Sequence, residues 1–157
     1  MKQEENLSTL VIHRFCGEEN YPIKRAECYI IEGDNTEDDR STLWLEVDCT
    51  IGSKLHDDTK SLNANPNWEV SFSNITLTKK DLIKGLHMEN ANDDQDSEAI
   101  LYYCEHQPTI DNKMEILEVT DNMLLIQLYG ETTDVNFYDG SKPLNKLYLN
   151  AWFTFKK

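Results

Sequence analysis

The chain has 157 residues, of which 29 are acidic and 15 are basic, so its formal net charge at pH 7 is −14. This length predicts a single domain, residues 1–157, that can bury a core without help from a disulfide or a metal. A content of 39% hydrophobic and 10% aromatic residues excludes the compositions that stay disordered. The charge argues against nucleic acid and against anionic membrane as partners, because both would repel the protein.

The N-terminus and the cysteines predict a cytoplasmic protein. Glu4 and Glu5 stand where a secretory signal would be positively charged, and the apolar run at residues 10–12 is too short for the core of a signal peptide. The four cysteines contain no CxxC pair and no zinc-like spacing, so we expect reduced thiols, no bound metal and no cofactor.

Alternation of apolar and polar residues dominates the chain and predicts β-strands, in which successive side chains point to opposite faces. The clearest case is the last apolar segment, where odd-numbered residues are apolar and face one way. The other runs are rich in β-branched or aromatic residues and are bounded by turn formers. In chain order, the predicted strands are residues 9–15, 26–32, 42–50, 68–77, 99–106, 113–119, 123–129 and 147–155.

Two connections have recognisable local signals. Asp121 and Asn122 tolerate positive φ and predict a tight hairpin. A short helix is expected over residues 79–86, with Thr78 as its N-cap and Asp81 in its first turn, although Gly85 weakens it. The fold class is therefore mainly β: an antiparallel β-sandwich or β-barrel of about eight strands with one short helix.

The excess negative charge gathers in two segments between predicted strands, residues 32–39 and 89–98. A run of this kind is commonly a solvated hairpin tip, but loops on a rigid β scaffold also carry binding sites. We therefore consider these acids as contacts for a basic partner. They are Asp34, Glu37, Asp38 and Asp39 in the first segment and Asp93, Asp94 and Asp96 in the second.

No motif in the sequence predicts catalysis or metal binding. Cys104 and His106 share a strand face but lie too far apart for a direct hydrogen bond. The segment from Asp134 to Gly140 is similar to a calcium loop, yet Asp139 stands where an EF-hand requires glycine. A tight turn leading into the last strand explains Asp139 and Gly140 better.

Two tryptophans lie on strand faces where alternation would place polar residues. Trp44 and Trp152 fall opposite the apolar faces of residues 42–50 and 147–155. Either a second layer covers them, or they form an aromatic anchor patch of the kind that dominates protein interfaces.

These observations favour a non-enzymatic, acidic protein-binding module, of the immunity or inhibitor type, that neutralises a basic protein partner. One alternative is a small-ligand binder, possibly with enzymatic activity, in which Tyr102, Tyr103, Cys104 and His106 line a cavity. Another is a structural subunit that associates with copies of itself through Trp44 and Trp152. The sequence does not predict an oligomeric state.

Overall fold

The computed structural model describes residues 9–32, 41–50, 65–75, 79–90, 98–103, 105–134, 137 and 139–156, with the backbone alone at residues 32, 74, 75, 105 and 106. Within these ranges the chain forms ten β-strands and one turn of 3-10 helix, η1 (Lys79–Asp81). The strands are β1 (Thr9–Arg14), β2 (Gly17–Glu32), β3 (Ser41–Cys49), β4 (Asn67–Ile75), β5 (His87–Asn90), β6 (Ala99–Tyr103), β7 (Glu105–Pro108), β8 (Ile110–Val119), β9 (Met123–Thr132) and β10 (Asn145–Phe155).

All ten strands belong to one sheet, in the order β5-β8-β9-β10-β1-β2-β3-β4-β6-β7, and neighbours in this order are antiparallel. Beyond the short β1, the end of β10 pairs in parallel with β2, with Thr154 opposite Glu27. The predicted antiparallel, mainly-β class is confirmed, but the described strands number ten instead of about eight.

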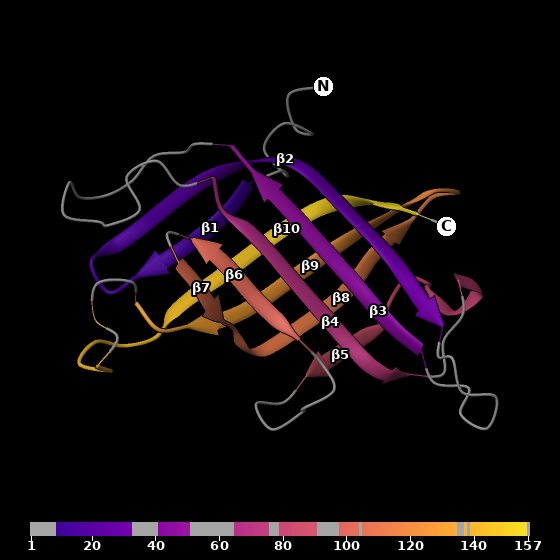
Figure 1. Cartoon of the computed structure of the whole chain (residues 1–157). Helices are drawn as coiled ribbons and strands as arrows, with labels where there is room; N and C mark the ends of the chain where they lie inside the picture. Colours follow the sequence, from indigo (N-terminus) through magenta and orange to yellow (C-terminus); the bar gives the residue numbers. More distant parts are fainter. Residues whose placement is uncertain are drawn as a thin grey trace.

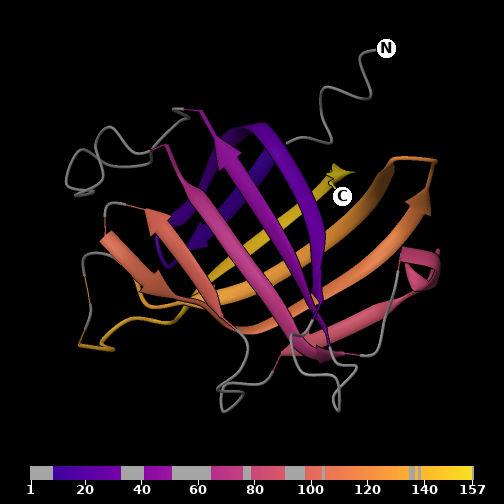
Figure 2. The ribbon, with the colours of Figure 1, turned by 45° about the vertical axis from the view of Figure 1, so that its right-hand side comes forward.

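The sheet rolls around a single core. Figures 1 and 2 show β2, β3, β4 and β6 on one side of the molecule and β8, β9 and β10 on the other. The side-chain amide of Asn90, on the end strand β5, donates a hydrogen bond of 3.0 Å to the backbone carbonyl of Ser71 on β4. The end strand β5 thus approaches β4, which lies two strands from the other end of the same sheet, and the ten described strands do not form the two separate sheets of a sandwich.

Two connections differ from the sequence-based expectation. The segment expected to be one strand, residues 99–106, contributes to the two strands β6 and β7, which pair with each other. The reversal leaves the alternation unbroken, because Leu101, Tyr103 and Gln107 are all odd-numbered and all buried. Nothing in the pattern therefore marks the turn.

The helix expected over residues 79–86 is only the three-residue η1. Gly85 has a φ of +94°, which a helix cannot include, and its backbone N–H donates to the carbonyl of Ile116 on β8 at 2.8 Å. The carbonyl of Leu86 in turn accepts from the N–H of Ile116. These hydrogen bonds to β8 end the helical segment, and β5 begins at His87.

The tight hairpin at Asp121 and Asn122 is confirmed. It joins β8 to β9, and the backbone N–H of Thr120 donates to the carbonyl of Met123 at 2.9 Å. Neither residue has a positive φ, so the hairpin lies where the sequence predicts it but does not use the positive-φ turn geometry on which the prediction was based.

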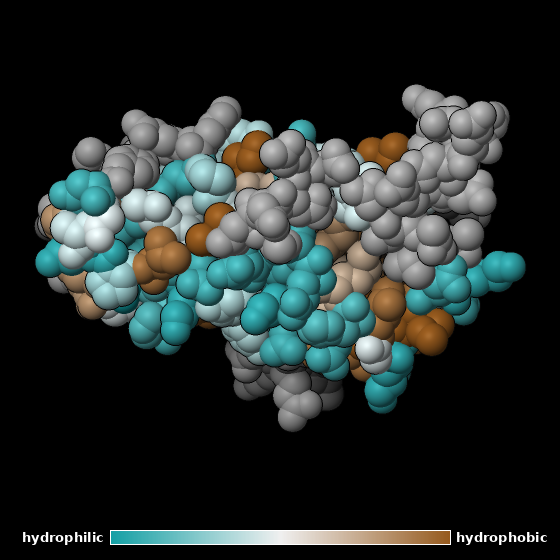
Figure 3. Space-filling model, turned by 90° about the horizontal axis from the view of Figure 1, so that it is seen from below, coloured by the Kyte–Doolittle hydropathy of each residue, from teal (hydrophilic) through white to brown (hydrophobic). Residues whose placement is uncertain are grey.

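Apolar residues from nearly every strand fill the interior and form one continuous cluster. The largest of them include Trp68, Phe72 and Phe153, each at most 2% exposed. Seen from below (Figure 3), the surface is mainly hydrophilic, with separate hydrophobic residues across it and the largest group of them toward the right of the view. Within the described residues, no helix is long and apolar enough to cross a membrane.

Candidate functional site

The residues predicted as partner contacts divide into two groups. Trp44 and Trp152 are described, whereas all the acidic ones lie outside the described residues. That second group consists of Asp34, Glu37, Asp38, Asp39, Asp93, Asp94 and Asp96. The prediction that these loop acids bind a partner therefore stays a prediction.

Both tryptophans lie on the outer surface of the rolled sheet and are half-buried. Trp44 on β3 stands opposite Tyr29 on β2, and their rings stack at 6.5 Å between centroids with an interplanar angle of 15°. Trp152 on β10 stands opposite Leu125 on β9. The strand β2 runs between β3 and the end of β10, so the two tryptophans flank β2 on opposite sides.

Next to Trp44, the strand register places a row of three glutamates across the outer face. Glu27 on β2 is directly opposite Glu46 on β3, and Glu46 is directly opposite Glu69 on β4. Adjacent strands lie about 4.8 Å apart, so the three carboxylates form a line across the strands. We call this line the glutamate row. Like charges directly opposite each other destabilise a sheet, so the row carries an energetic cost in the isolated protein.

The electrostatic cost is visible at Glu69. Partial burial, and then the nearby charges of Glu46, Asp48 and Glu98, raise the pKa of Glu69 above its ordinary value of 4.5. Glu46 is held by the hydroxyl of Tyr29, which donates to its Oε1 at 2.8 Å. Partial burial of the Tyr29 hydroxyl, and then its hydrogen bond to Glu46, raise the pKa of Tyr29 to about 12.

Among the described residues, the cations that form ion pairs with the row lie at its Glu27 end. Arg25 Nη1 lies 3.1 Å from Glu27 Oε1, and Lys156 Nζ lies 3.4 Å from Glu27 Oε2. No cation among the described residues forms an ion pair with Glu46 or Glu69. Within the described part of the chain, the central and far positions of the row thus form no ion pair, although the charge of Arg25 still acts on Glu46.

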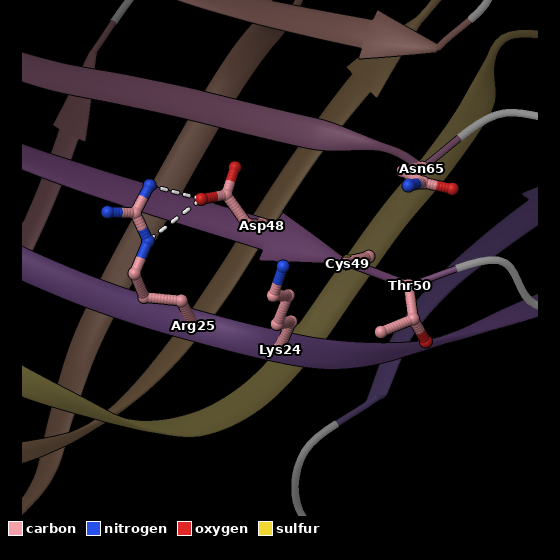
Figure 4. A pocket seen from close by; sticks show the side chains of 6 residues that line it. All are labelled: Lys24, Arg25, Asp48, Cys49, Thr50 and Asn65. Carbon is pink, nitrogen blue, oxygen red and sulfur yellow. Dashed lines mark hydrogen bonds and ion pairs between the residues drawn. The ribbon is translucent and has the colours of Figure 1, made fainter.

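A recess open to solvent lies beside this end of the row (Figure 4). Arg25 reaches across from β2 and donates from Nε to Asp48 Oδ2 on β3 at 2.8 Å, with a second bond from Nη2 to the same oxygen. Lys24 points into the recess between the two strands. The remaining lining residues are Cys49, Thr50 and Asn65.

A second group of ionisable residues lies inside the rolled sheet, where the inward positions change from apolar to polar. Arg14 is fixed by two bonds to Asp134, at 2.8 and 3.0 Å, and by a longer one to Glu19 at 3.3 Å. Tyr21 donates to Glu19 Oε1 at 2.9 Å, and the hydroxyl of Tyr103 also donates to this oxygen. We call these residues the interior network.

The interior network is closed to solvent, with each of its members at most 2% exposed. Hydrogen bonding to Asp134 raises the pKa of Arg14, and burial raises the pKa of Tyr103 and of Tyr21. The carboxylates thus face a permanent cation and neutral hydroxyls. This arrangement satisfies buried charges and holds β1, β2, β6 and the end of β9 together.

The residues considered for a ligand cavity do not all face the same way. Tyr103 points into the interior, whereas Tyr102, its neighbour on β6, is on the opposite face of the strand and only half-buried. Cys104 and the side chain of His106 lie outside the described residues. The ligand-binding alternative therefore gains no support from a shared cavity of the two tyrosines.

The tight turn predicted at Asp139 and Gly140 is present. Gly140 has a φ of +80°, and Asp139 Oδ1 accepts from the backbone N–H of Ser141 at 3.0 Å. Asp134 is buried against Arg14 instead of facing this turn. In the part of the chain that the structure describes, no three His, Cys, Asp or Glu side chains are grouped to hold a metal ion.

Comparison with models of protein families, with curated proteins and with solved structures finds no match to this chain. Sequence reasoning missed the glutamate row, although each glutamate lies within a predicted strand. Only the pairing of β2 with β3 and of β3 with β4 aligns them.

Proposed function

We propose that this protein is a non-enzymatic binding module of the immunity or inhibitor type, which covers a basic surface of a protein partner with the outer face of β2, β3 and β4. The observation that carries the proposal is the glutamate row, a line of like charges that is unfavourable in the free protein. A cationic partner would remove this repulsion on binding.

The flanking aromatic pair supports the same assignment. Tyr29 and Trp44 stack beside Glu46 and offer a rigid apolar surface next to the charges. Aromatic residues lose little conformational entropy on binding and are common energetic centres of interfaces. The net charge of −14 would accelerate the encounter with a basic protein.

The proposal predicts that removing charge from the glutamate row weakens binding without lowering the stability of the protein. Replacing Glu46 and Glu69 together by Gln should weaken the binding of cationic octapeptides, octa-lysine and octa-arginine, by about tenfold or more at low salt, since two charges are lost from the contact. The thermal midpoint of the same variant should stay level or rise, because the repulsion is relieved. Isothermal titration calorimetry and thermal unfolding measure the two effects.

A control variant removes a single carboxylate from another part of the surface and is compared with the single change Glu69→Gln. Glu115 on β8 is exposed, and its cross-strand neighbours are His87 and Gln127 rather than carboxylates. The variant Glu115→Gln should leave peptide affinity within about twofold of the parent protein. The proposed function would be contradicted if neither peptide bound the parent protein. It would also be contradicted if the double variant and the parent bound the peptides with equal affinity.

A further inference from the structure

The chain itself shows how a guanidinium fits this outer face. Arg25 bridges carboxylates on two neighbouring strands, with Nη1 at 3.1 Å from Glu27 on β2 and Nε at 2.8 Å from Asp48 on β3. Three separate nitrogens take part, because Nη2 also bonds Asp48. A lysine has a single nitrogen and no planar fork with which to do this.

The next pair of carboxylates along the row forms no ion pair among the described residues. Glu46 on β3 and Glu69 on β4 are directly opposite each other on the same face, whereas Glu27 and Asp48, which Arg25 bridges, are diagonal neighbours on β2 and β3. In the described part of the chain, neither forms an ion pair. Tyr29 fixes the position of Glu46 through its hydroxyl, so one half of this pair is preorganised.

The stacked rings of Tyr29 and Trp44 adjoin this pair. Trp44 is two residues from Glu46 on the same face of β3, and Tyr29 connects the ring pair to the Glu46 carboxylate. A guanidinium can lie flat on an aromatic ring while its edge bonds carboxylates, and it is less strongly hydrated than an ammonium. At half-buried carboxylates the more weakly hydrated cation loses less on binding.

We infer that Glu46, Glu69 and Trp44 form a subsite for an arginine side chain of the basic partner, and that this face selects arginine over lysine. The inference rests on the proposed function, because it names the partner group that the same face recognises. The occupant is an arginine side chain of a protein segment. Its positive charge pairs with the two carboxylates, and the plane of its guanidinium lies against the ring of Trp44.

The test compares octa-arginine, octa-lysine and octa-citrulline, which has the shape of arginine without its charge. Titration calorimetry of the whole chain at moderate salt should show octa-arginine binding about tenfold tighter than octa-lysine, as expected from one stacked, bidentate contact. Octa-citrulline should not bind measurably. Equal affinity for the two cationic peptides would overturn the arginine subsite while leaving the proposed function standing, whereas failure of both to bind would overturn both.

Octa-arginine and octa-lysine can also contact acidic residues elsewhere on the chain. Variants of the subsite therefore test whether the preference for arginine arises at Glu46, Glu69 and Trp44. Trp44→Leu should reduce the arginine preference to less than about threefold, and Trp44→Phe should retain most of it, because phenylalanine preserves a ring for stacking. Glu69→Gln should lower octa-arginine affinity more than octa-lysine affinity. Thermal unfolding verifies that each variant is folded. An unchanged preference in folded Trp44→Leu would overturn the subsite.

Discussion

The interior network and the glutamate row both bring together carboxylates from different parts of the chain. The two regions differ in whether the chain compensates the negative charge. Inside, Arg14 and the hydroxyls of Tyr21 and Tyr103 accompany Glu19 and Asp134. Outside, Glu46 and Glu69 face each other, and the described cations lie only at the Glu27 end.

The difference separates carboxylates that are compensated inside the chain from carboxylates for which we propose a binding role. A buried carboxylate must be compensated within the chain, because solvent cannot screen it. A carboxylate on the outer face can be left uncompensated at modest cost, and its charge stays available to another molecule. Removal of charge should therefore have opposite effects on stability in the two regions.

The largest effect is expected at Arg14. Replacement by Met removes the buried cation and leaves Glu19 and Asp134 facing each other without compensation, so we expect a loss of about 3–5 kcal/mol in the free energy of unfolding. Urea denaturation measures it. The matched change Arg25→Met, at a side chain that is 54% exposed, should cost far less, because solvent screens an exposed ion pair.

Two further results bear on the Arg14 prediction. If Arg14→Met does not fold, the double variant Arg14→Met/Asp134→Asn should recover part of the stability, because one of the stranded charges is removed. Equal losses for Arg14→Met and Arg25→Met would contradict the distinction between the two regions.

An intermediate effect is expected from the tyrosines that donate to glutamates in each region. Tyr103→Phe leaves a buried oxygen of Glu19 with one donor fewer and should cost about 1–3 kcal/mol. Tyr29→Phe, on the outer face, should cost less than about 1 kcal/mol, because water can replace its bond to Glu46. Chemical denaturation of both variants provides the comparison, and a larger loss for Tyr29→Phe would refute it.

The smallest effect, and the one with the opposite sign, is expected at Glu69. Glu69→Gln removes a like charge opposite Glu46 and should stabilise the protein by about 0.2–1 kcal/mol at pH 7. The control Glu115→Gln should change stability by less than about 0.5 kcal/mol.

The gain should depend on pH in a defined direction. The pKa of Glu69 is raised in the folded protein, so the folded state binds its proton more tightly than the unfolded state does. The parent protein is therefore penalised above the raised pKa, and it regains this stability as the pH falls through that pKa toward the ordinary value of 4.5. The advantage of Glu69→Gln, measured by urea denaturation from pH 7 to pH 4, should shrink accordingly. A gain that grows toward pH 4 would contradict the assignment.

Local patterns in the sequence were sufficient for much of the fold. Alternation located segments of β1, β3, β4, β8, β9 and β10, and Asp121 and Asn122 located a hairpin. The same local reasoning failed at residues 99–106, where the alternation passes through a chain reversal, and at Gly85, whose positive φ and bond to β8 end the helix early.

The sequence by itself determined that the chain is acidic, mainly β and built from strands with one apolar face, because composition and a period of two are local properties. The alternation in residues 42–50 also places Glu46 on the polar face of its strand, and Glu27 and Glu69 lie within two other predicted strands. Only the tertiary structure decided that these three residues lie side by side, while Glu19 and Asp134 meet Arg14 inside. Strand order and register depend on contacts between distant segments, and a shift of one residue would turn each glutamate to the other face.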